Sequence, residues 1–384
     1  MFDRLARLRL LHLWHLFPAV LLLGARQVGK TTLARASFPG LPYCDLEEPA
    51  LRQLFADDPT FQVESRLAKG LILDEAQSVP AVFPALRGLI DGRRQRKGQF
   101  LILGSAQPSL VRAVSESLAG RVGILELDPL TASEAQTGDH PHDWKRIWLQ
   151  GGFPDALADS FREWWEAYLR TYVERDLPHL GLGADPLLLR RLLTMLAHSQ
   201  GGLLNASQLG KSLGVSYHTV QRYLDILEQT FLLRRLPPYF RNIGKRLTKS
   251  SKLYLRDTGL LHHLLNIGSL EELDTHPVRG ASWETFVLED LIRREKLKNP
   301  QTQFFFWRTA SGDEIDLIIE RGGQLLAVEI KAGHGQSREA HLLQKAIGDI
   351  GARAAYLLDQ ASGAERLAPH IQRRGFAKSL DWLP

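Results

Sequence analysis

The sequence is poor in the residues that cross-link or anchor a chain: it has one cysteine, two methionines and no long apolar run. A single thiol cannot form an intrachain disulfide, so we expect a reducing, cytoplasmic setting with Cys44 packed in a core. A membrane span needs about 18 consecutive apolar residues, and no stretch approaches this length, so no membrane partner is expected. Pro18 interrupts the apolar run near the N-terminus, which argues against a signal peptide.

Acidic residues are missing from the stretch 231–256, which contains eight basic ones. These are Arg234, Arg235, Arg241, Lys245, Arg246, Lys249, Lys252 and Arg256. The whole chain has a net charge of +5, which permits a nucleic-acid partner without requiring one. Its 384 residues are too many for one ordinary core and predict two or three domains.

Three short apolar segments, at residues 19–23, 71–73 and 100–103, predict strands that are buried on both faces. Helical or loop segments lie between them, and this alternation is typical of a parallel sheet covered by helices. The pattern ends near Pro129, and a helix is expected over residues 2–16. We therefore predict an α/β fold for this part of the chain.

The first of these strands leads into a glycine-bearing loop with the spacing of a Walker A motif, followed by a helix. Glycines let the backbone N–H groups of such a loop face phosphate oxygens, and the helix N-terminus adds positive potential. We expect Lys30 to reach the outer phosphates of ATP and the Thr31 hydroxyl to ligate Mg²⁺. The predicted nucleotide-binding residues are Gly24, Ala25, Arg26, Gln27, Val28, Gly29, Lys30, Thr31 and Thr32.

The next two strands end in polar side chains, at the sheet edge where ligands bind in such folds. We expect Asp74 to hold the Mg²⁺ shell and Glu75 to orient or deprotonate the attacking water. Ser105 follows the third strand and is expected to sense the γ-phosphate, with Gln107 behind it. The alternative for this pair is an ordinary turn after a strand.

Arg121 precedes another apolar strand and is a candidate arginine finger. In that role it would reach the ATP of a neighbouring subunit and stabilise charge in the transition state. The role requires a homo-oligomer, for example a hexamer. The alternative is a surface arginine in a turn.

Residues 19–180 resemble the AAA-type ATPases of the AAA+ superfamily that carry a C-terminal domain of unknown function and occur in bacteria and archaea. The resemblance extends over nearly the whole chain and implies ATP hydrolysis and oligomers. It rests on residues 24–33, 73–77, 117–122, 151–154 and 172–177.

Residues 205–229 predict two short helices that meet at Gly214, with Ser216 capping the second. This pattern resembles a winged helix, in which the outward side of the second helix touches DNA. The alternative is a winged helix used only for packing. The predicted contacts, to the backbone of duplex or branched DNA rather than to a particular sequence, are Tyr217, His218, Gln221, Arg222, Arg234, Arg235, Arg241, Lys245 and Arg246.

A second candidate active site lies in the C-terminal part of the chain. Glu284 is expected on the inward face of a helix, Asp316 in a strand, and Glu329 and Lys331 on one face of the next strand. The three acids could bind Mg²⁺ and Lys331 could position water for phosphodiester hydrolysis. The order resembles the restriction-endonuclease-like PD-(D/E)xK nucleases. The alternative is the same fold without cleavage.

These observations predict an ATPase core over residues 1–130, a helical lid or connector over 131–185, a winged helix over 186–245 and a restriction-endonuclease-like α/β domain over 246–384. The leading hypothesis is a DNA-acting motor or switch in which ATP turnover governs DNA binding, remodelling or cleavage. One rival is an ATP-dependent DNA-binding protein with an inert C-terminal domain. The other is a regulatory ATPase that acts on a protein partner.

Overall fold

The computed structural model describes residues 2–105, 108–137, 141–157, 160–177, 185–239, 250–309, 311–333 and 337–380. The chain forms two compact units. The N-terminal unit contains residues 3–129 with 229–231, and the C-terminal unit contains the remainder. Among the helices of the described residues, none combines the length and the apolar composition that a membrane span requires.

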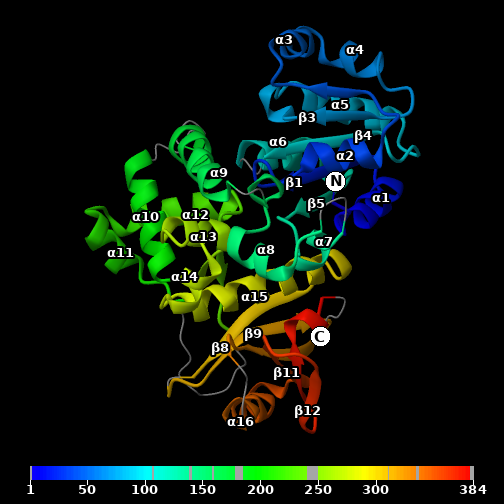
Figure 1. Cartoon of the computed structure of the whole chain (residues 1–384). Helices are drawn as coiled ribbons and strands as arrows, with labels where there is room; N and C mark the ends of the chain where they lie inside the picture. The colour runs from blue at the N-terminus through cyan, green and yellow to red at the C-terminus, as the bar shows by residue number, and fades with distance from the viewer. Residues whose placement is uncertain are drawn as a thin grey trace. The chain divides into compact units, whose positions relative to one another are not determined.

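The N-terminal unit is built on a parallel sheet with the strand order β2-β3-β4-β1-β5. Four of its strands, β1, β3, β4 and β5, are labelled in Figure 1. Its strands are β1 (Ala19–Gly24), β2 (Tyr43–Asp45), β3 (Leu71–Asp74), β4 (Phe100–Ser105) and β5 (Val122–Leu127). Every residue of β1, β3 and β4 is buried, as expected for strands with both faces covered. The predicted parallel α/β arrangement is confirmed. It places the ends of these three strands at one edge of the sheet.

Helices cover both faces of this sheet. Leu21, Leu73 and Ile102 share one hydrophobic core with α4, α5 and α6, while α1 and α2 contact β1 and each other. The predicted helix over residues 2–16 begins only at Ala6. The helices of the unit are α1 (Ala6–Leu16), α2 (Lys30–Ser37), α3 (Pro49–Asp57), α4 (Pro59–Glu64), α5 (Val82–Gly92) and α6 (Pro108–Leu118), with a 3₁₀ turn at Ala76–Ser78.

The C-terminal unit begins with a helical region that ends in a two-stranded antiparallel sheet. Strands β6 (Leu233–Leu236) and β7 (Lys252–Leu255) pair with each other, so this sheet includes residues on both sides of the predicted boundary at 245. The preceding helices are α7 (Ala132–Ala135), α8 (Trp144–Gln150), a 3₁₀ turn (Pro154–Leu157), α9 (Phe161–Tyr168), a π-helix (Leu169–Asp176), α10 (Pro186–His198), α11 (Ala206–Leu213) and α12 (Tyr217–Gln229).

The rest of the C-terminal unit contains a six-stranded sheet with the order β12-β13-β11-β10-β9-β8. Strands β8, β9 and β10 are antiparallel neighbours, whereas β10 and β11 are parallel and joined through α16. The elements are α13 (Thr258–Leu264), α14 (Leu270–Thr275), α15 (Arg279–Lys298), β8 (Gln303–Arg308), β9 (Glu314–Arg321), β10 (Gln324–Ile330), α16 (Ser337–Ala346), a π-helical turn (Ile347–Gly351), β11 (Ala354–Asp359), β12 (Ala364–Ala368), β13 (Ile371–Gly375) and a 3₁₀ turn (Phe376–Lys378).

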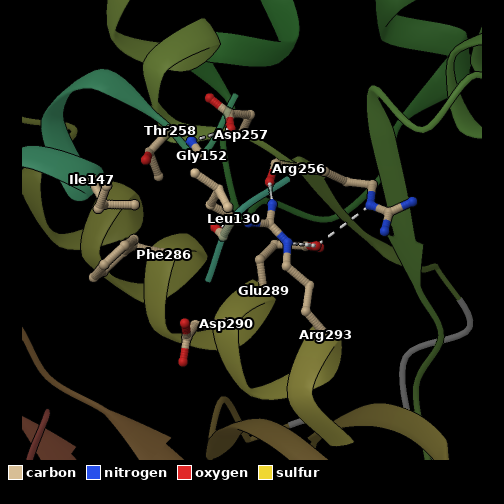
Figure 2. A pocket seen from close by; sticks show the side chains of 10 residues that line it. All are labelled: Leu130, Ile147, Gly152, Arg256, Asp257, Thr258, Phe286, Glu289, Asp290 and Arg293. Carbon is tan, nitrogen blue, oxygen red and sulfur yellow. Dashed lines mark hydrogen bonds and ion pairs between the residues drawn. The ribbon is translucent and has the colours of Figure 1, made fainter. Parts of the chain in front are cut away.

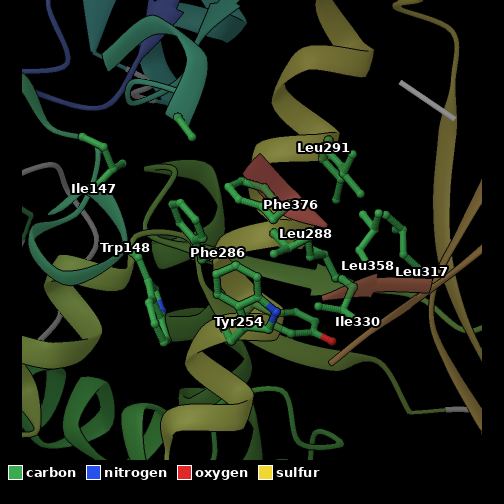
Figure 3. Packing of buried hydrophobic residues seen from close by; sticks show 14 of the residues in the cluster. Ile147, Trp148, Tyr254, Phe286, Leu288, Leu291, Leu317, Ile330, Leu358 and Phe376 are labelled. Carbon is green, nitrogen blue, oxygen red and sulfur yellow. The ribbon is translucent and has the colours of Figure 1, made fainter. Parts of the chain in front are cut away.

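Helices α15 and α16 cover opposite faces of this sheet. Figure 3 shows Leu288 and Leu291 of α15 beside Leu317 and Ile330 of the strands. Leu343 of α16 belongs to a separate core on the other face. This alternation follows from the period of two along each strand, which sends successive side chains to opposite faces.

Candidate active sites

The Walker A loop is tightly held by its own backbone. Gln27 and Gly29 have positive φ values of 62° and 97°, which curl the loop. A side chain at Gly24 would place its Cβ only 2.4 Å from the Leu127 oxygen, so glycine is required where β1 meets β5. The Lys30 ammonium donates hydrogen bonds to the carbonyls of Gly24 and Ala25 at 3.2 and 2.9 Å.

Lys30 is buried at the start of α2. Burial lowers the pKa of its ammonium group, while the charges of Glu75 and Asp74 oppose this effect. The two neutral carbonyls that Lys30 contacts are weaker partners than a phosphate oxygen. The lysine is therefore placed so that an arriving anion can take over its hydrogen bonds.

Asp74 and Thr31 meet beside this loop. The Thr31 hydroxyl donates to Asp74 Oδ2 at 2.6 Å, and the Tyr43 hydroxyl donates to the same oxygen at 2.8 Å. A hydroxyl and a carboxylate at this separation suit Mg²⁺, which prefers oxygen ligands. The residues present thus fit the ion. Sequence reasoning missed Tyr43, because β2 is only three residues long and carries no strong strand pattern.

Glu75 lies between the ends of β3 and β4. Its backbone adopts the left-handed region at φ 48° and ψ 45°, which costs a non-glycine residue about 1 kcal/mol or more. The Ser105 hydroxyl donates to Glu75 Oε1 at 3.3 Å, and the Gln77 amide donates to Glu75 Oε2. Gln77 was also missed, and Gln107 lies outside the described residues.

Arg121 has a partner within its own subunit. Its guanidinium donates to Asp91 Oδ1 at 2.8 Å and to Asp91 Oδ2 at 3.0 Å, and also to the Ala119 carbonyl. Such a bidentate pair fixes the arginine on the end of α5. A finger role would require this pair to open, and it stays a prediction.

The second helix of the predicted winged helix, α12, has the expected local structure at its start. The Thr219 amide donates to Ser216 Oγ at 3.1 Å, and Gly214 has a positive φ of 71° between α11 and α12. Tyr217, His218 and Arg222 are exposed. Gln221 is half-buried and donates to the Tyr217 hydroxyl at 3.1 Å. These residues share one accessible side, and their contact with DNA stays a prediction.

The sequence of the stretch 231–256 contains no acidic residue, but acids from other elements contact it in the structure. The inference that its charge is uncompensated is therefore corrected for the residues that the structure describes. Arg234 forms an ion pair with buried Glu289, and Arg235 pairs with Asp225 at 2.7 Å and with Glu228. These acids come from α12 and α15, so neither arginine presents an uncompensated charge. Arg241, Lys245, Arg246 and Lys249 lie outside the described residues.

Glu289 belongs to a buried cluster of charges shown in Figure 2, among residues that line a small cavity. Burial raises the pKa of Glu289, but Arg234 and Arg256 more than offset this effect and bring the pKa to about 2. Arg293 also lies near, 3.8 Å from Glu289 Oε2. The Glu289 carboxylate is fully paired within the protein, and we assign it a structural role.

The predicted nuclease-like residues also come together, with one addition. The Lys252 ammonium of β7 lies 2.9 Å from Glu284 Oε1 and 3.7 Å from Asp316 Oδ1, and it also contacts Glu314 at 2.6 Å. Lys331 pairs with Glu329 in the next strand. Sequence reasoning counted Lys252 only as part of the basic stretch, because no strand was predicted where β7 forms.

The acids of this cluster do not have the setting of an open metal site. Across the described residues, no three His, Cys, Asp or Glu side chains are grouped so that they could hold a metal ion. Burial, followed by the charges of Glu284 and Glu329, raises the pKa of Asp316 well above its usual value. Burial also raises the pKa of Glu329. With an ammonium group among the acids, the residues present do not fit Mg²⁺ in this arrangement.

Three family models match successive parts of the chain. Residues 16–136 match a family described as an AAA domain. Residues 141–271 match a domain of unknown function, DUF8612, and residues 279–369 match another, DUF4143. Together with the loop geometry around Lys30, the first match defines an AAA-type P-loop ATPase domain.

Two relatives share most of the chain. They are the uncharacterized protein Rv2008c of Mycobacterium tuberculosis and the uncharacterized protein Mb2031c of Mycobacterium bovis, each 44% identical over 335 residues, or 86% of this chain and 73% of the relative. The chain belongs to the family of these mycobacterial proteins. A solved structure, the Walker-type ATPase paby2304 of Pyrococcus abyssi, is 16% identical with a TM-score of 0.44, over 69% of this chain and 96% of that one.

Proposed function

We propose that the protein is an Mg²⁺-dependent ATPase whose nucleotide cycle governs DNA binding. The observation that carries the ATPase part is the 2.6 Å contact between Thr31 Oγ1 and Asp74 Oδ2 beside the Walker A loop. These two oxygens are ligands of the kind that Mg²⁺ prefers. The bound ion would neutralise charge on the outer phosphates of ATP.

Lys30, Glu75 and Ser105 supply the remaining chemistry of this proposal. Lys30 exchanges the carbonyls of its loop for phosphate oxygens, because an ammonium group binds a charged oxygen more strongly than a neutral one. Glu75 orients the attacking water and accepts its proton. Ser105 donates to Glu75 Oε1 and sits at the end of β4, where its single hydroxyl proton can turn to the γ-phosphate instead.

The test is ATP turnover by Lys30→Ala and Glu75→Gln variants. Lys30→Ala should weaken ATP binding or abolish hydrolysis, because a phosphate loses its cationic partner. Glu75→Gln should keep ATP binding and lower kcat about a hundredfold or more, because the amide cannot accept the proton. Arg112→Ala, an exposed change on α6, should turn over ATP like the parent. Parental kcat in both active-site variants would contradict the proposal.

The DNA part of the proposal draws on the order of elements in the C-terminal unit. Helices α10, α11 and α12 followed by the β6–β7 pair have the succession of a winged helix, and the start of α12 is exposed. The basic residues of 241–249 lie between these two strands in the sequence. Measuring ATPase activity with single-stranded, duplex and branched DNA tests whether the two activities are coupled. An ATPase rate indifferent to all three, without any DNA binding, would favour the protein-partner alternative.

The C-terminal sheet has the order helix, three antiparallel strands, helix and parallel strand from α15 to β11, which supports a restriction-endonuclease-like assignment. Of the cleaving and non-cleaving forms of the hypothesis, the setting of Asp316 favours the non-cleaving one. Mg²⁺-dependent nicking of plasmid DNA by the parent, lost in Lys331→Ala, would reverse this choice.

A further inference from the structure

The position of Lys252 is unusual for a lysine in a sheet. Its side chain is only 4% exposed, and its ammonium group is surrounded by carboxylates from α15 and β9. A buried ammonium group is costly unless it is paired and hydrogen-bonded. Glu284 and Glu314 provide these pairs, and the pKa of Lys252 is raised despite its burial because of the surrounding acids.

The backbone that delivers Lys252 is held on two sides. Within β7 it pairs with Leu236 of β6, and on its other edge it bridges to Leu203. The rings of Tyr254 and Phe306 lie 5.8 Å from the ammonium group, and the Tyr254 hydroxyl also donates to Glu284. The lysine is therefore part of the packed structure rather than a surface side chain that has folded inward.

The charge balance of the cluster depends on this residue. Four acids, Glu284, Glu314, Asp316 and Glu329, face Lys252 and Lys331, and Arg308 pairs with Glu314 at the edge. A divalent ion placed among the same oxygens would meet the charge of Lys252 at close range, where like charges repel strongly in a buried setting. Without Lys252, the four acids would have only two cations against them.

We infer that Lys252 is the resident cation of this carboxylate cluster, and that it takes the place of the divalent metal which a nuclease of this fold would bind. Strand β7 thereby closes the C-terminal site with a residue from the β6–β7 sheet. The inference rests on the restriction-endonuclease-like assignment proposed above, but it concerns metal binding and does not require DNA cleavage. It accounts for a complete set of nuclease-like side chains with a lysine ammonium group among its acids.

The experiment measures Mn²⁺ binding to the full-length protein by isothermal titration calorimetry without nucleotide. We compare the parent, Lys252→Met, the double variant Lys252→Met with Asp316→Asn, and Lys345→Met. Lys345 is a matched control because its ammonium group also pairs with a carboxylate, Asp313, but at the surface. Circular dichroism melting of each variant checks that it is folded.

Removal of Lys252 should let the carboxylates, which are not grouped as metal ligands around the lysine, close on an ion. Lys252→Met should therefore gain one Mn²⁺ site per chain, with affinity at least about tenfold above that of the parent. The double variant should lose this gain, because Asp316 supplies one of the ligands. Lys345→Met should behave like the parent. Because the added site depends on Asp316, it can be distinguished from Mn²⁺ binding at Asp74 in the ATPase site.

Equal, Asp316-dependent Mn²⁺ binding by the parent and by Lys252→Met would overturn the inference. If Lys252→Met does not fold, the parent and Asp316→Asn decide alone: Mn²⁺ binding that differs between them overturns the inference, and equal binding supports it. ATPase and DNA-binding assays on the same preparations test the proposed function separately. A parent protein that binds no DNA but gives the expected Mn²⁺ result would count against the proposed function and not against this inference.

Discussion

Single side chains set the electrostatics of the ATPase site, and the sequence motifs assigned no role to two of them. Tyr43 shares an oxygen of Asp74 with Thr31, and Gln77 holds the second oxygen of Glu75. Burial and the hydrogen bond to Asp74 raise the pKa of the Tyr43 hydroxyl above its ordinary value. The motifs predicted the charged residues because their spacing is specific. The neutral partners depend on where neighbouring strands end, which spacing alone does not show.

Gln77 is expected to act as a positioning residue for Glu75. Gln77→Leu should lower kcat about tenfold while KM for ATP changes little, because the carboxylate loses its orientation but the phosphate loop is untouched. Steady-state ATPase kinetics measure this split. Gln77→Asn, which keeps an amide, should recover part of kcat. A rise in KM as large as the fall in kcat, or no recovery of kcat in Gln77→Asn, would indicate a merely structural role.

Another side chain, His262, should make the stability of the C-terminal unit depend on pH. A chain of hydrogen bonds fixes its neutral form: Trp148 donates to Ser282 Oγ, Ser282 donates to His262 Nε2, and His262 Nδ1–H donates to the Leu149 carbonyl. Burial lowers the pKa of His262 from 6.5 to about 4. The unfolded chain therefore binds the extra proton at a higher pH than the folded chain does.

Because the pKa is depressed in the folded state, the contribution of His262 is complete above pH 6.5 and is lost as pH falls toward 4. The lost stability should be on the order of 3 kcal/mol. Urea unfolding at several pH values measures it. His262→Gln should lower stability at pH 7 and flatten the dependence between pH 6.5 and 4, whereas an unchanged slope would contradict the assigned pKa.

Secondary-structure elements show where sequence patterns are informative and where they are not. The runs that became β1, β3 and β4 predicted strands correctly, because strands buried on both faces are continuously apolar. The stretch 231–256 misled for a physical reason. Arg235 pairs with acids of α12, just before the stretch, and Arg234 and Arg256 pair with Glu289 of α15, which is distant in sequence. Charge runs predict a surface only when no other element supplies the counter-charge.

Helix α12 allows a direct test of the DNA interface. Arg222→Ala should weaken duplex binding for all sequences and reduce the slope of log affinity against log salt by about one, because one phosphate contact is lost. Arg235→Ala should leave the slope near that of the parent, since Arg235 is already paired with Asp225 and Glu228. Fluorescence anisotropy at several salt concentrations measures both. A larger effect from Arg235 than from Arg222 would move the interface away from α12.

The whole molecule raises the question of whether ATP hydrolysis requires neighbouring subunits. Arg121 is the candidate that could link them, and its pairing with Asp91 means that it reaches a neighbour only after that pair opens. Arg121→Ala should therefore lower kcat strongly if the residue acts between subunits, and Asp91→Asn, which frees the guanidinium, should not lower it.

Mixing inactive subunits distinguishes action between subunits from action within one. Arg121→Ala subunits keep Glu75, and Glu75→Gln subunits keep Arg121, so an equal mixture should form about one quarter of its interfaces with both groups intact. ATPase activity should then reappear, up to about a quarter of the parental rate, although neither variant is active alone. The necessary control is Lys30→Ala in place of Glu75→Gln, which should also complement because it too retains Arg121. Mixtures that stay inactive would indicate that Arg121 acts within its own subunit, and a strictly monomeric parent with full turnover would leave it as a surface residue paired with Asp91.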